Sequence, residues 1–527
     1  MVWGEDMRRR NTPARALVAC AVLALLTACG GGTAERARPS GSSSGGTEEN
    51  GDPVATPTAS RPPAEGKGSE DPDDINGDGH RDLLIPVGGG SGAGERTPRQ
   101  VAVVFGSAGG PDPATRTVHD RASLVPRPRE PDRAPRNGIG PAQITTADLD
   151  GDGYPDFVTQ YSEPLTREES QRDTSGHAQR SALAVSWGGP AGPAGPRDGT
   201  PPTTVRPAGN TAAGGLDAAV RGDFDGDGHH DLAALRQDGT AVLILHGPFS
   251  RSGVPARTDT RPGTRDARRL IADDIDPTGE PRATGLLVHR GGDGEQVGGL
   301  FYTARRGSGL AASGEEVRKG NAVAFGDFDG DGRRDLAVGD DGSRNDEPGY
   351  RTEAPEVHAS LAVHPGTGGP PRTVQLPETR KPYGPGGYSA ADPDGDGRDA
   401  LLVATDDGAL LIDLLDGDGD RRTEVLRLGP ARVPGEPDGK SGKSGKPGKS
   451  RTVPAEDREA RPYGAADFDG DGRDELVLNW AAHSLFGFYG EDPTHWWITR
   501  GTGPGNMTAF TTTPFLDGDT AGAGDGG

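Results

Sequence analysis

The chain carries seven copies of a nine-residue Asp-Gly pattern, and this repeat restricts its fold more than any other feature. The most regular copy runs from Asp327 to Asp335, with carboxylates at positions 1, 3, 5 and 9 and glycines at positions 4 and 6. Glycine permits the positive φ angles of a sharp turn, so the alternate carboxylates point toward one centre. At an effective dielectric of about 20, two such charges about 5 Å apart repel by roughly 3 kcal/mol. The loop therefore needs a cation, and an all-oxygen, carboxylate-rich ligand set favours Ca²⁺.

Six of the copies are close to complete, and together they predict about five to six Ca²⁺ sites. The predicted ligands are Asp74, Asn76, Asp78 and Asp82; Asp148, Asp150, Asp152 and Asp156; Asp223, Asp225, Asp227 and Asp231; Asp327, Asp329, Asp331 and Asp335; Asp392, Asp394 and Asp396; and Asp467, Asp469, Asp471 and Glu475. The remaining copy is eroded, because it starts at Asp274 and has Arg282 at position 9. The copy at Asp392 has Ala400 at that position. We expect the Asp274 loop to be empty and the Asp392 loop to bind weakly.

The residues around each loop predict β-strands rather than the helices of an EF-hand. An EF-hand needs a bidentate acid at position 12, where this chain has apolar residues such as Ile85 and Val338. Apolar runs flank the loops, as in residues 322–325 and 336–338, and a further apolar segment that ends in glycine follows, as in 101–106. The copies start 51 to 75 residues apart, a spacing typical of a repeat architecture. Seven four-stranded units predict an all-β fold, a seven-bladed β-propeller with Ca²⁺ loops between the first and second strands of its blades.

The loop pattern D-x-[DN]-x-D-G-x-x-D-[LF], in register with its flanking strands, resembles the FG-GAP/VCBS repeat family. That family includes the propeller heads of integrin α subunits. The resemblance covers roughly residues 70 to 515. It implies that the loops hold Ca²⁺ and that the propeller is a binding module, but the motif does not specify a ligand.

The N-terminal segment predicts export and a lipid anchor. Residues 8–10 and Arg15 form a basic region, and residues 16–26 form an apolar stretch that is too short to span a bilayer. The sequence Leu26-Thr27-Ala28-Cys29 then resembles a bacterial lipobox. We expect cleavage before Cys29 and a diacylglycerol on its thiol, with an ordinary secretory signal as the alternative. The protein is then exported and held, by lipid alone, on the outer face of a bacterial cytoplasmic membrane, facing the cell exterior.

Composition divides the chain into four parts. Residues 30 to about 70 are rich in Gly, Ser, Pro and Thr, a composition typical of a flexible tether. The predicted parts are residues 1–28, a lipoprotein signal peptide; 29–70, the tether; 71–515, the propeller; and 516–527, a disordered tail.

The net charge of the chain and the long loops between its predicted strands indicate which class of partner it binds. A net charge of −23 argues against nucleic-acid binding, and six divalent cations would cancel roughly half of it. Because antiparallel strands alternate in direction, connections between second and third strands reach the face opposite the Asp loops. Several of these are long, such as 160–181 and 339–360, and a Lys-rich insertion at 440–449 lies between two units. We expect this face to bind a protein or a carbohydrate at the cell envelope, unless the long loops are only spacers.

No catalytic residue is predicted. The chain has no H-E-x-x-H motif and no cysteine nucleophile in its folded part. The leading interpretation is therefore a non-catalytic binding or adhesion module. The alternatives are an extracellular polysaccharide-acting, lyase-like enzyme on a Ca²⁺-bearing propeller, and a structural or sensor protein of the envelope.

Four smaller predictions concern single segments. The tripeptide Arg221-Gly222-Asp223 is expected to serve the metal loop and not recognition, and Trp496-Trp497 is expected to pack within a strand. The imidazoles of His229 and His230 are expected to face solvent. Residues 66–73 are polar and supply no first strand for the first unit, so we expect residues 507–515 to fill that place and close the ring.

Overall fold

The computed structural model describes the residues that form the propeller. These are 56–88, 98–126, 138–165, 179–195, 200–208, 215–263, 267–291, 296–342, 356–380, 386–415, 417, 419–435, 448–481 and 493–516. All of them belong to one compact unit, Glu48–Gly527. The predicted signal peptide, Cys29, most of the predicted tether and residues 517–527 lie outside the described residues. In the described part of the chain, no helix is long and apolar enough to cross a membrane.

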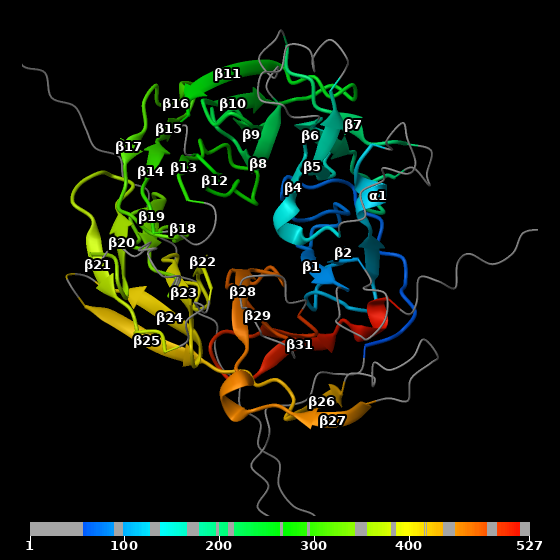
Figure 1. Ribbon diagram of the computed structural model, residues 1–527, viewed down its shortest axis with the longest axis vertical. Helices are drawn as coiled ribbons and strands as arrows, with labels where there is room; N and C mark the ends of the chain where they lie inside the picture. Colours follow the sequence, from blue (N-terminus) through cyan, green and yellow to red (C-terminus); the bar gives the residue numbers. More distant parts are fainter. Residues whose placement is uncertain are drawn as a thin grey trace, which may run out of the picture. The chain divides into compact units, whose positions relative to one another are not determined.

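Seven antiparallel sheets follow one another around a ring, and each is one blade of a β-propeller (Figure 1). The predicted all-β, seven-bladed fold is therefore confirmed. Blades 1 to 4 consist of β1 (Leu83–Val87), β2 (Gln100–Val104) and β3 (Arg116–His119); β4 (Ile144–Ala147), β5 (Asp156–Pro164), β6 (Gln179–Ser186) and β7 (Thr203–Thr204); β8 (Leu216–Gly222), β9 (Asp231–Arg236), β10 (Ala241–His246) and β11 (Arg257–Pro262); and β12 (Arg269–Ala272), β13 (Leu286–His289), β14 (Gly299–Tyr302) and β17 (Glu315–Glu316).

Blades 5 to 7 repeat the four-stranded arrangement. They consist of β18 (Ala322–Gly326), β19 (Asp335–Gly339), β20 (Ser360–His364) and β21 (Arg372–Gln375); β22 (Tyr388–Ala391), β23 (Ala400–Thr405), β24 (Gly408–Leu414) and β25 (Asp420–Val425); and β28 (Arg461–Ala466), β29 (Glu475–Trp480), β30 (His495–Thr499) and β31 (Asn506–Thr511). Two hairpins lie outside the blades, β15 (Ala304–Arg305) with β16 (Gly309–Leu310), and β26 (Arg432–Gly435) with β27 (Gly448–Thr452). One short helix, α1 (Arg121–Leu124), follows blade 1.

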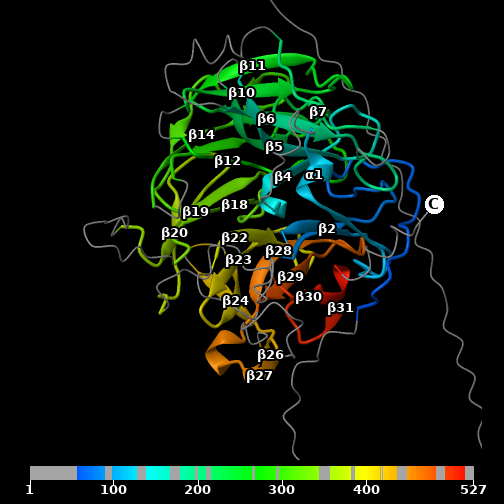
Figure 2. The ribbon, with the colours of Figure 1, turned by 45° about the vertical axis from the view of Figure 1, so that its right-hand side comes forward.

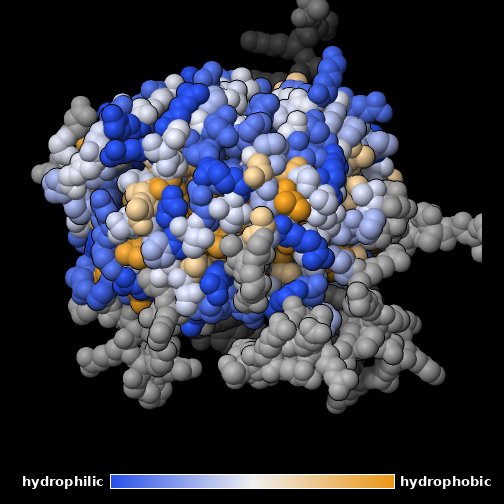
Figure 3. Space-filling model, turned by 90° about the horizontal axis from the view of Figure 1, so that it is seen from above, coloured by the Kyte–Doolittle hydropathy of each residue, from blue (hydrophilic) through white to orange (hydrophobic). Residues whose placement is uncertain are grey.

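The middle strands of the blades hold the core. Every residue of β10 is buried, and so is all of β9 except Arg236. A strand reads as a continuous apolar run when both of its faces are covered, and here neighbouring blades cover them. One apolar cluster joins blades 2 and 3, and another joins blades 5 and 6. The outside is mostly hydrophilic, as the view in Figure 3 shows, and the exposed large hydrophobic side chains among the described residues are Val254, Leu415, Leu426 and Tyr463.

Within the described residues, the ring closes by apolar packing and a hydrogen bond from the Tyr463 hydroxyl to the Leu84 carbonyl and not by strand exchange, so the prediction for residues 507–515 is wrong. Strand β31 pairs with β30 as the fourth strand of blade 7. The predicted third strand of that blade, 485–489, lies outside the described residues, and β30 takes its place. Blade 1 has three strands in the described part of the chain. Blades 1 and 7 meet in one apolar cluster that contains Ile85, Trp496 and Phe510, and Figures 1 and 2 place β31 near blade 1.

The described end of the predicted tether contacts the propeller. The backbone N–H groups of Lys67 and Gly68 donate to the carbonyl of Gly77 in the first Asp loop, at 2.9 and 3.1 Å. Thr56 accepts a hydrogen bond through its hydroxyl from the backbone N–H of Thr511, at 3.1 Å. This segment therefore contacts both the first loop and the last strand, on either side of the ring closure.

Candidate metal-binding loops

The Asp loops lie where the sequence predicts them, directly before the second strand of each described four-stranded blade or, in blade 1, before β1. The loop of blade 5 illustrates the geometry. Gly330 and Gly332 have φ angles of 74° and 81°, which only glycine adopts without strain. The backbone N–H groups of Gly330 and Gly332 each donate a 2.8 Å hydrogen bond to Asp327, one to each carboxylate oxygen. The backbone thus folds around the first carboxylate.

The ninth-position acid ties the loop to the rest of the blade. In blade 5, one oxygen of Asp335 accepts from the N–H of Phe328 at 3.0 Å, and the other accepts from the N–H of Gly366, after the third strand, at 2.8 Å. Blades 1, 2 and 3 repeat both contacts with Asp82, Asp156 and Asp231. The glycine that ends each of these apolar segments therefore serves the loop.

Carboxylates from each of several loops converge within metal-binding distance of one another. Ligand oxygens of the following groups lie within 4.8 Å: Asp148, Asp150 and Asp156; Asp223, Asp225 and Asp227; Asp327, Asp329 and Asp335; and Asp392, Asp394 and Asp396. These groups consist of predicted ligands. Four blades therefore assemble a cluster of hard oxygen donors, as a Ca²⁺ site requires.

The third-position side chain has an orphaned oxygen in four different loops. Oδ1 of Asn76, Asp150, Asp225 and Asp469 is buried and has no hydrogen-bond partner in the described structure. Buried polar atoms in native proteins are almost always paired, so the same orphan at one loop position in four blades indicates a missing partner. A cation is the partner that fits an oxygen surrounded by other carboxylates.

Burial raises the pKa of several buried loop carboxyls. It brings the pKa of Asp148, Asp223 and Asp335 to about 6, and neighbouring carboxylates add to this effect while backbone N–H groups oppose it. The pKa of Glu475 rises to about 7 for the same reasons. Such shifts mean that the ionised loops are destabilised by desolvation and mutual repulsion, which a bound cation would relieve.

Comparison with known proteins identifies one of these units. The FG-GAP repeat family matches residues 319–350, which span the first strand, the Asp loop and the second strand of blade 5. The chain contains an FG-GAP repeat. The predicted resemblance to this family, and the propeller that it implies, are therefore confirmed, while Ca²⁺ binding remains a prediction.

Two solved structures are similar to this propeller at a low level. One is BBS1N in complex with ARL6DN, soaked with lead, with 12% identity and a TM-score of 0.29 over 64% of this chain and 89% of that one. The other is the Vibrio cholerae biofilm matrix protein Bap1, with 12% identity and a TM-score of 0.27 over 86% of this chain and 84% of that one. No curated protein is significantly similar in sequence. At these TM-scores the similarities support no conclusion about function.

The eroded loop of blade 4 is neutralised by arginines. Asp273 is buried and forms ion pairs with Arg282 and, at 3.1 Å, with Arg334 of blade 5. Asp274 is paired with Arg221 of blade 3 at 2.8 Å. Guanidinium groups therefore balance the charge of the acids at and directly before this loop, while the expectation that the loop is empty remains a prediction.

Arginines also contact the third-position acids of complete loops. Arg257 pairs with Asp225 at 2.7 Å and Arg500 with Asp469 at 3.1 Å, in each case through Oδ2, so the buried Oδ1 stays unpaired. Arg421 pairs with Asp394 at 3.2 Å. These guanidiniums are more than half exposed, and exposed pairs of this kind contribute little free energy.

Position 8 has a function that the sequence analysis missed, because its side chain joins neighbouring loops. Oδ2 of Asp399 accepts from the N–H of Asp327 at 2.7 Å, and Nδ1 of His230 accepts from the N–H of Asp148 at 2.8 Å. The prediction that His230 faces solvent is therefore wrong: it is buried, and burial lowers its pKa to about 4, whereas His229 is exposed. A polar residue at position 8 was the available signal.

The other minor predictions agree with the structure. The side chain of Arg221 lies between Asp73 and Asp274, so the tripeptide at 221–223 is not an exposed recognition motif. Trp496 and Trp497 are buried in β30, and they are packed within blade 7 as expected.

Proposed function

We propose that this FG-GAP propeller is a non-catalytic, lipid-anchored cell-surface binding module whose loops hold structural Ca²⁺. The orphaned third-position oxygen, repeated in four loops, is the observation that carries the Ca²⁺ part of the proposal. Positions 1, 3, 5 and 9 of each near-complete loop would hold the ion. The ion would supply positive charge at the centre of the loop, while the backbone contacts of positions 1 and 9 hold the first, second and third strands of the blade together.

The face opposite the loops is the proposed binding face. A cavity of about 20 Å³ lies there between blades 5 and 6, where the second strands of both blades end. It is lined by Asp340, Asp341, Glu378 and Asp406, among others. The side chain of Asp406 is 4% exposed and its Oδ1 has no partner among the described residues. Arg380 already pairs with Asp406 at 3.6 Å, and the cavity has room for about one water, so the acidic groups around its mouth are what favour a cationic group of the partner, such as a lysine or an amino sugar.

Binding assays with the purified extracellular part would test this function. We expect the protein to retain either a protein from an envelope extract or a set of glycans on an array, in a Ca²⁺-dependent manner. Asp406→Asn should weaken this binding, whereas Asp420→Asn, at the exposed start of β25 on the loop side of blade 6, should not. The appearance of unsaturated uronate absorbance with acidic polysaccharides would instead favour the lyase-like enzyme.

Cell fractionation tests the anchor, for which the motif Leu26-Thr27-Ala28-Cys29 is the support. Cys29→Ala should release the protein into the medium or leave it unprocessed. A variant that fractionates with membranes just as the wild type does would contradict the lipid anchor and leave the Ca²⁺ proposal untouched.

A further inference from the structure

Among the described loops, that of blade 3 differs from the others because an imidazole contacts two of its ligand carboxylates. His246 is the last residue of β10 and directly precedes Gly247, whose N–H donates to Asp231. The residue before the corresponding glycine is Phe105 in blade 1 and Trp187 in blade 2. Those positions pack apolar side chains, but the side chain of His246 is only 5% exposed and presents nitrogen to the carboxylates of the loop.

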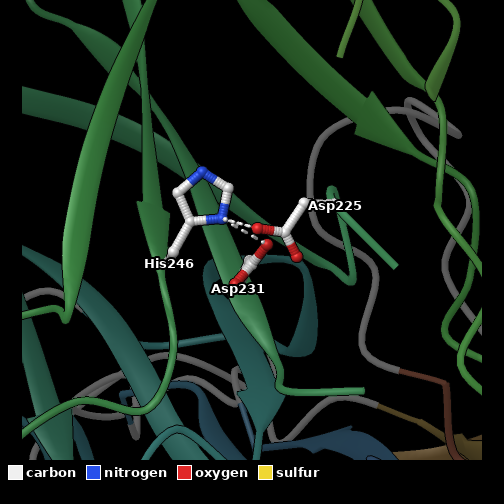
Figure 4. A group of neighbouring side chains, drawn as sticks. All are labelled: Asp225, Asp231 and His246. Atoms are coloured by element: carbon white, nitrogen blue, oxygen red, sulfur yellow. Dashed lines mark hydrogen bonds and ion pairs between the residues drawn. The ribbon is translucent and has the colours of Figure 1, made fainter. Parts of the chain in front are cut away.

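Both ring nitrogens of His246 face carboxylates. Nδ1 lies 3.0 Å from Oδ2 of Asp231 and 3.2 Å from Oδ2 of Asp225. Figure 4 shows this side of the ring directed at the two carboxylates. Nε2 lies 3.2 Å from Oδ2 of Asp259, on the neighbouring strand β11. The ligand atoms of Asp225, Asp231 and His246 all lie within 4.8 Å of one another. One side of the ring thus faces a convergent donor set, and the other side faces a single carboxylate.

This arrangement matches the one that proteins use to hold a metal-binding histidine. A ligating histidine usually donates its second ring N–H to a carboxylate, which sets the tautomer and the orientation of the ring. Asp259 is placed to accept that hydrogen from Nε2, which leaves the lone pair of Nδ1 directed at Asp225 and Asp231. Oδ1 of Asp225 is buried without a hydrogen-bond partner, so the cluster still has an unused oxygen donor.

We propose that the blade 3 loop binds a divalent transition-metal ion of the Zn²⁺ class, through Nδ1 of His246 and the carboxylates of Asp225 and Asp231. This inference shares one element with the proposed function, namely that the Asp loops bind cations. Imidazole nitrogen suits Zn²⁺, Co²⁺ or Cu²⁺, whereas Ca²⁺ is held by oxygen. Asp259 is a positioning residue. Asp223 and Asp227 share Asp225 in a second convergent group and supply further oxygen donors.

Metal analysis of the whole chain tests the proposal. Chelator-treated protein is dialysed against millimolar Ca²⁺ with micromolar Zn²⁺, and bound metals are counted by mass spectrometry. The wild type should retain one Zn²⁺ per chain together with Ca²⁺. His246→Phe, which introduces the residue of blade 1, should lose Zn²⁺ and keep Ca²⁺ in the other loops. Asp259→Asn should weaken Zn²⁺ binding by about 10- to 100-fold. His229→Ala, which removes an exposed imidazole, should bind Zn²⁺ as the wild type does.

A spectroscopic measurement keeps the test independent of how the variants fold. Electron paramagnetic resonance of the Cu²⁺-loaded wild type should show nitrogen coupling from one imidazole. Retention of Zn²⁺ by His246→Phe, or Cu²⁺ spectra with oxygen ligands alone, would overturn the proposal. Binding of Ca²⁺ without any Zn²⁺ would also overturn it, since His246 would then be a protonated internal cation, but the proposed Ca²⁺ function would stand. Binding of neither ion would reject both.

Discussion

The loops of blades 4 and 5 occupy equivalent places in neighbouring blades and deal with negative charge in opposite ways. In blade 5, no lysine, arginine or histidine within the described residues pairs with Asp327, Asp329, Asp331 or Asp335. In blade 4, three arginines pair with Asp273 and Asp274. We propose that the blade 5 loop binds an external cation, whereas the acids of the blade 4 loop pair with arginines of the chain itself.

The difference shows what the Asp loop contributes to the propeller. Every blade must bring acidic groups together where its first strand turns into its second. In blade 4 the charge is balanced by guanidinium groups, of which Arg221 comes from blade 3 and Arg334 from blade 5; in the near-complete loops we propose that an ion balances it. An ion stabilises one blade, whereas a guanidinium also joins two. The acids of blade 4 are therefore held by ion pairs with blades 3 and 5 and not by an ion within the blade.

Removal of calcium should have the largest effect, because it acts on every loop of the blade 5 kind. A ligand at millimolar concentration with a Kd of about 10⁻⁴ to 10⁻³ M adds roughly 0.4 to 1.4 kcal/mol per site. Over the near-complete loops the sum is several kcal/mol. The thermal unfolding midpoint should fall clearly in EGTA and recover with Ca²⁺. An unchanged midpoint would reject metal binding by these loops.

The calcium-free protein should lose stability as the pH rises from about 4 to 7. The pKa values of Asp148, Asp223 and Asp335 are raised to about 6 in the folded chain. Raised carboxyl pKa values stabilise the fold below the unfolded value near 4, and this contribution is lost as the pH passes the folded value. Since one pKa unit is about 1.4 kcal/mol, each of these three shifts of about two units accounts for roughly 3 kcal/mol, and His230, whose pKa burial lowers to about 4, offsets part of the combined loss.

Urea unfolding at several pH values would measure this loss, and saturating Ca²⁺ should reduce it. The arginine-paired Asp73 behaves differently. Burial raises its pKa, but Arg221 and Arg81 together hold the pKa well below its ordinary value. Its contribution is therefore complete above about pH 4 and does not alter the slope in this window. A stability that increases between pH 4 and 7 without calcium would contradict the prediction.

Arg221→Met should destabilise the protein by about 1 to 2 kcal/mol, less than the loss of a fully buried pair, because Asp73 and Asp274 are 30% and 47% exposed and Asp73 keeps Arg81. The loss should be the same in Ca²⁺ and in EGTA. Arg333→Met, at an exposed position of the blade 5 loop, is the matched control and should unfold like the wild type. If added Ca²⁺ restored the stability of Arg221→Met, an ion could replace the arginine, and the distinction between the two blades would disappear.

The smallest effect should come from one acid in one loop. Asp329 and Asp276 both occupy position 3, in blades 5 and 4, but Asp276 only accepts hydrogen bonds from Thr278. Asp329→Ala should lose one Ca²⁺ per chain and about 1 kcal/mol of stability at millimolar Ca²⁺. Asp276→Ala should keep the calcium count of the wild type. Calorimetric counting of bound Ca²⁺ distinguishes the two, and equal losses would mean that blade 4 also binds an ion.

The sequence by itself determined the number of blades, the position of each loop and which loop is exceptional. Each of these depends on residues within one short segment: glycines with positive φ, carboxylates at alternate positions, and apolar strands on either side. The replacement of an acid by Arg282 already indicated that blade 4 would differ.

Only the tertiary structure decided how distant segments complete these loops. Arg221 meets Asp73 from 148 residues away, and His230 meets Asp148 from 82 residues away. From the sequence alone, His246 is only the last residue of a predicted strand. The packing of β10 and β11 against the loop is what brings its side chain to Asp225 and Asp259. The closure of the ring was misjudged for the same reason. The strand propensity of residues 506–511 is local, but the choice between the edge of blade 7 and that of blade 1 depends on which neighbour offers an unpaired strand in space.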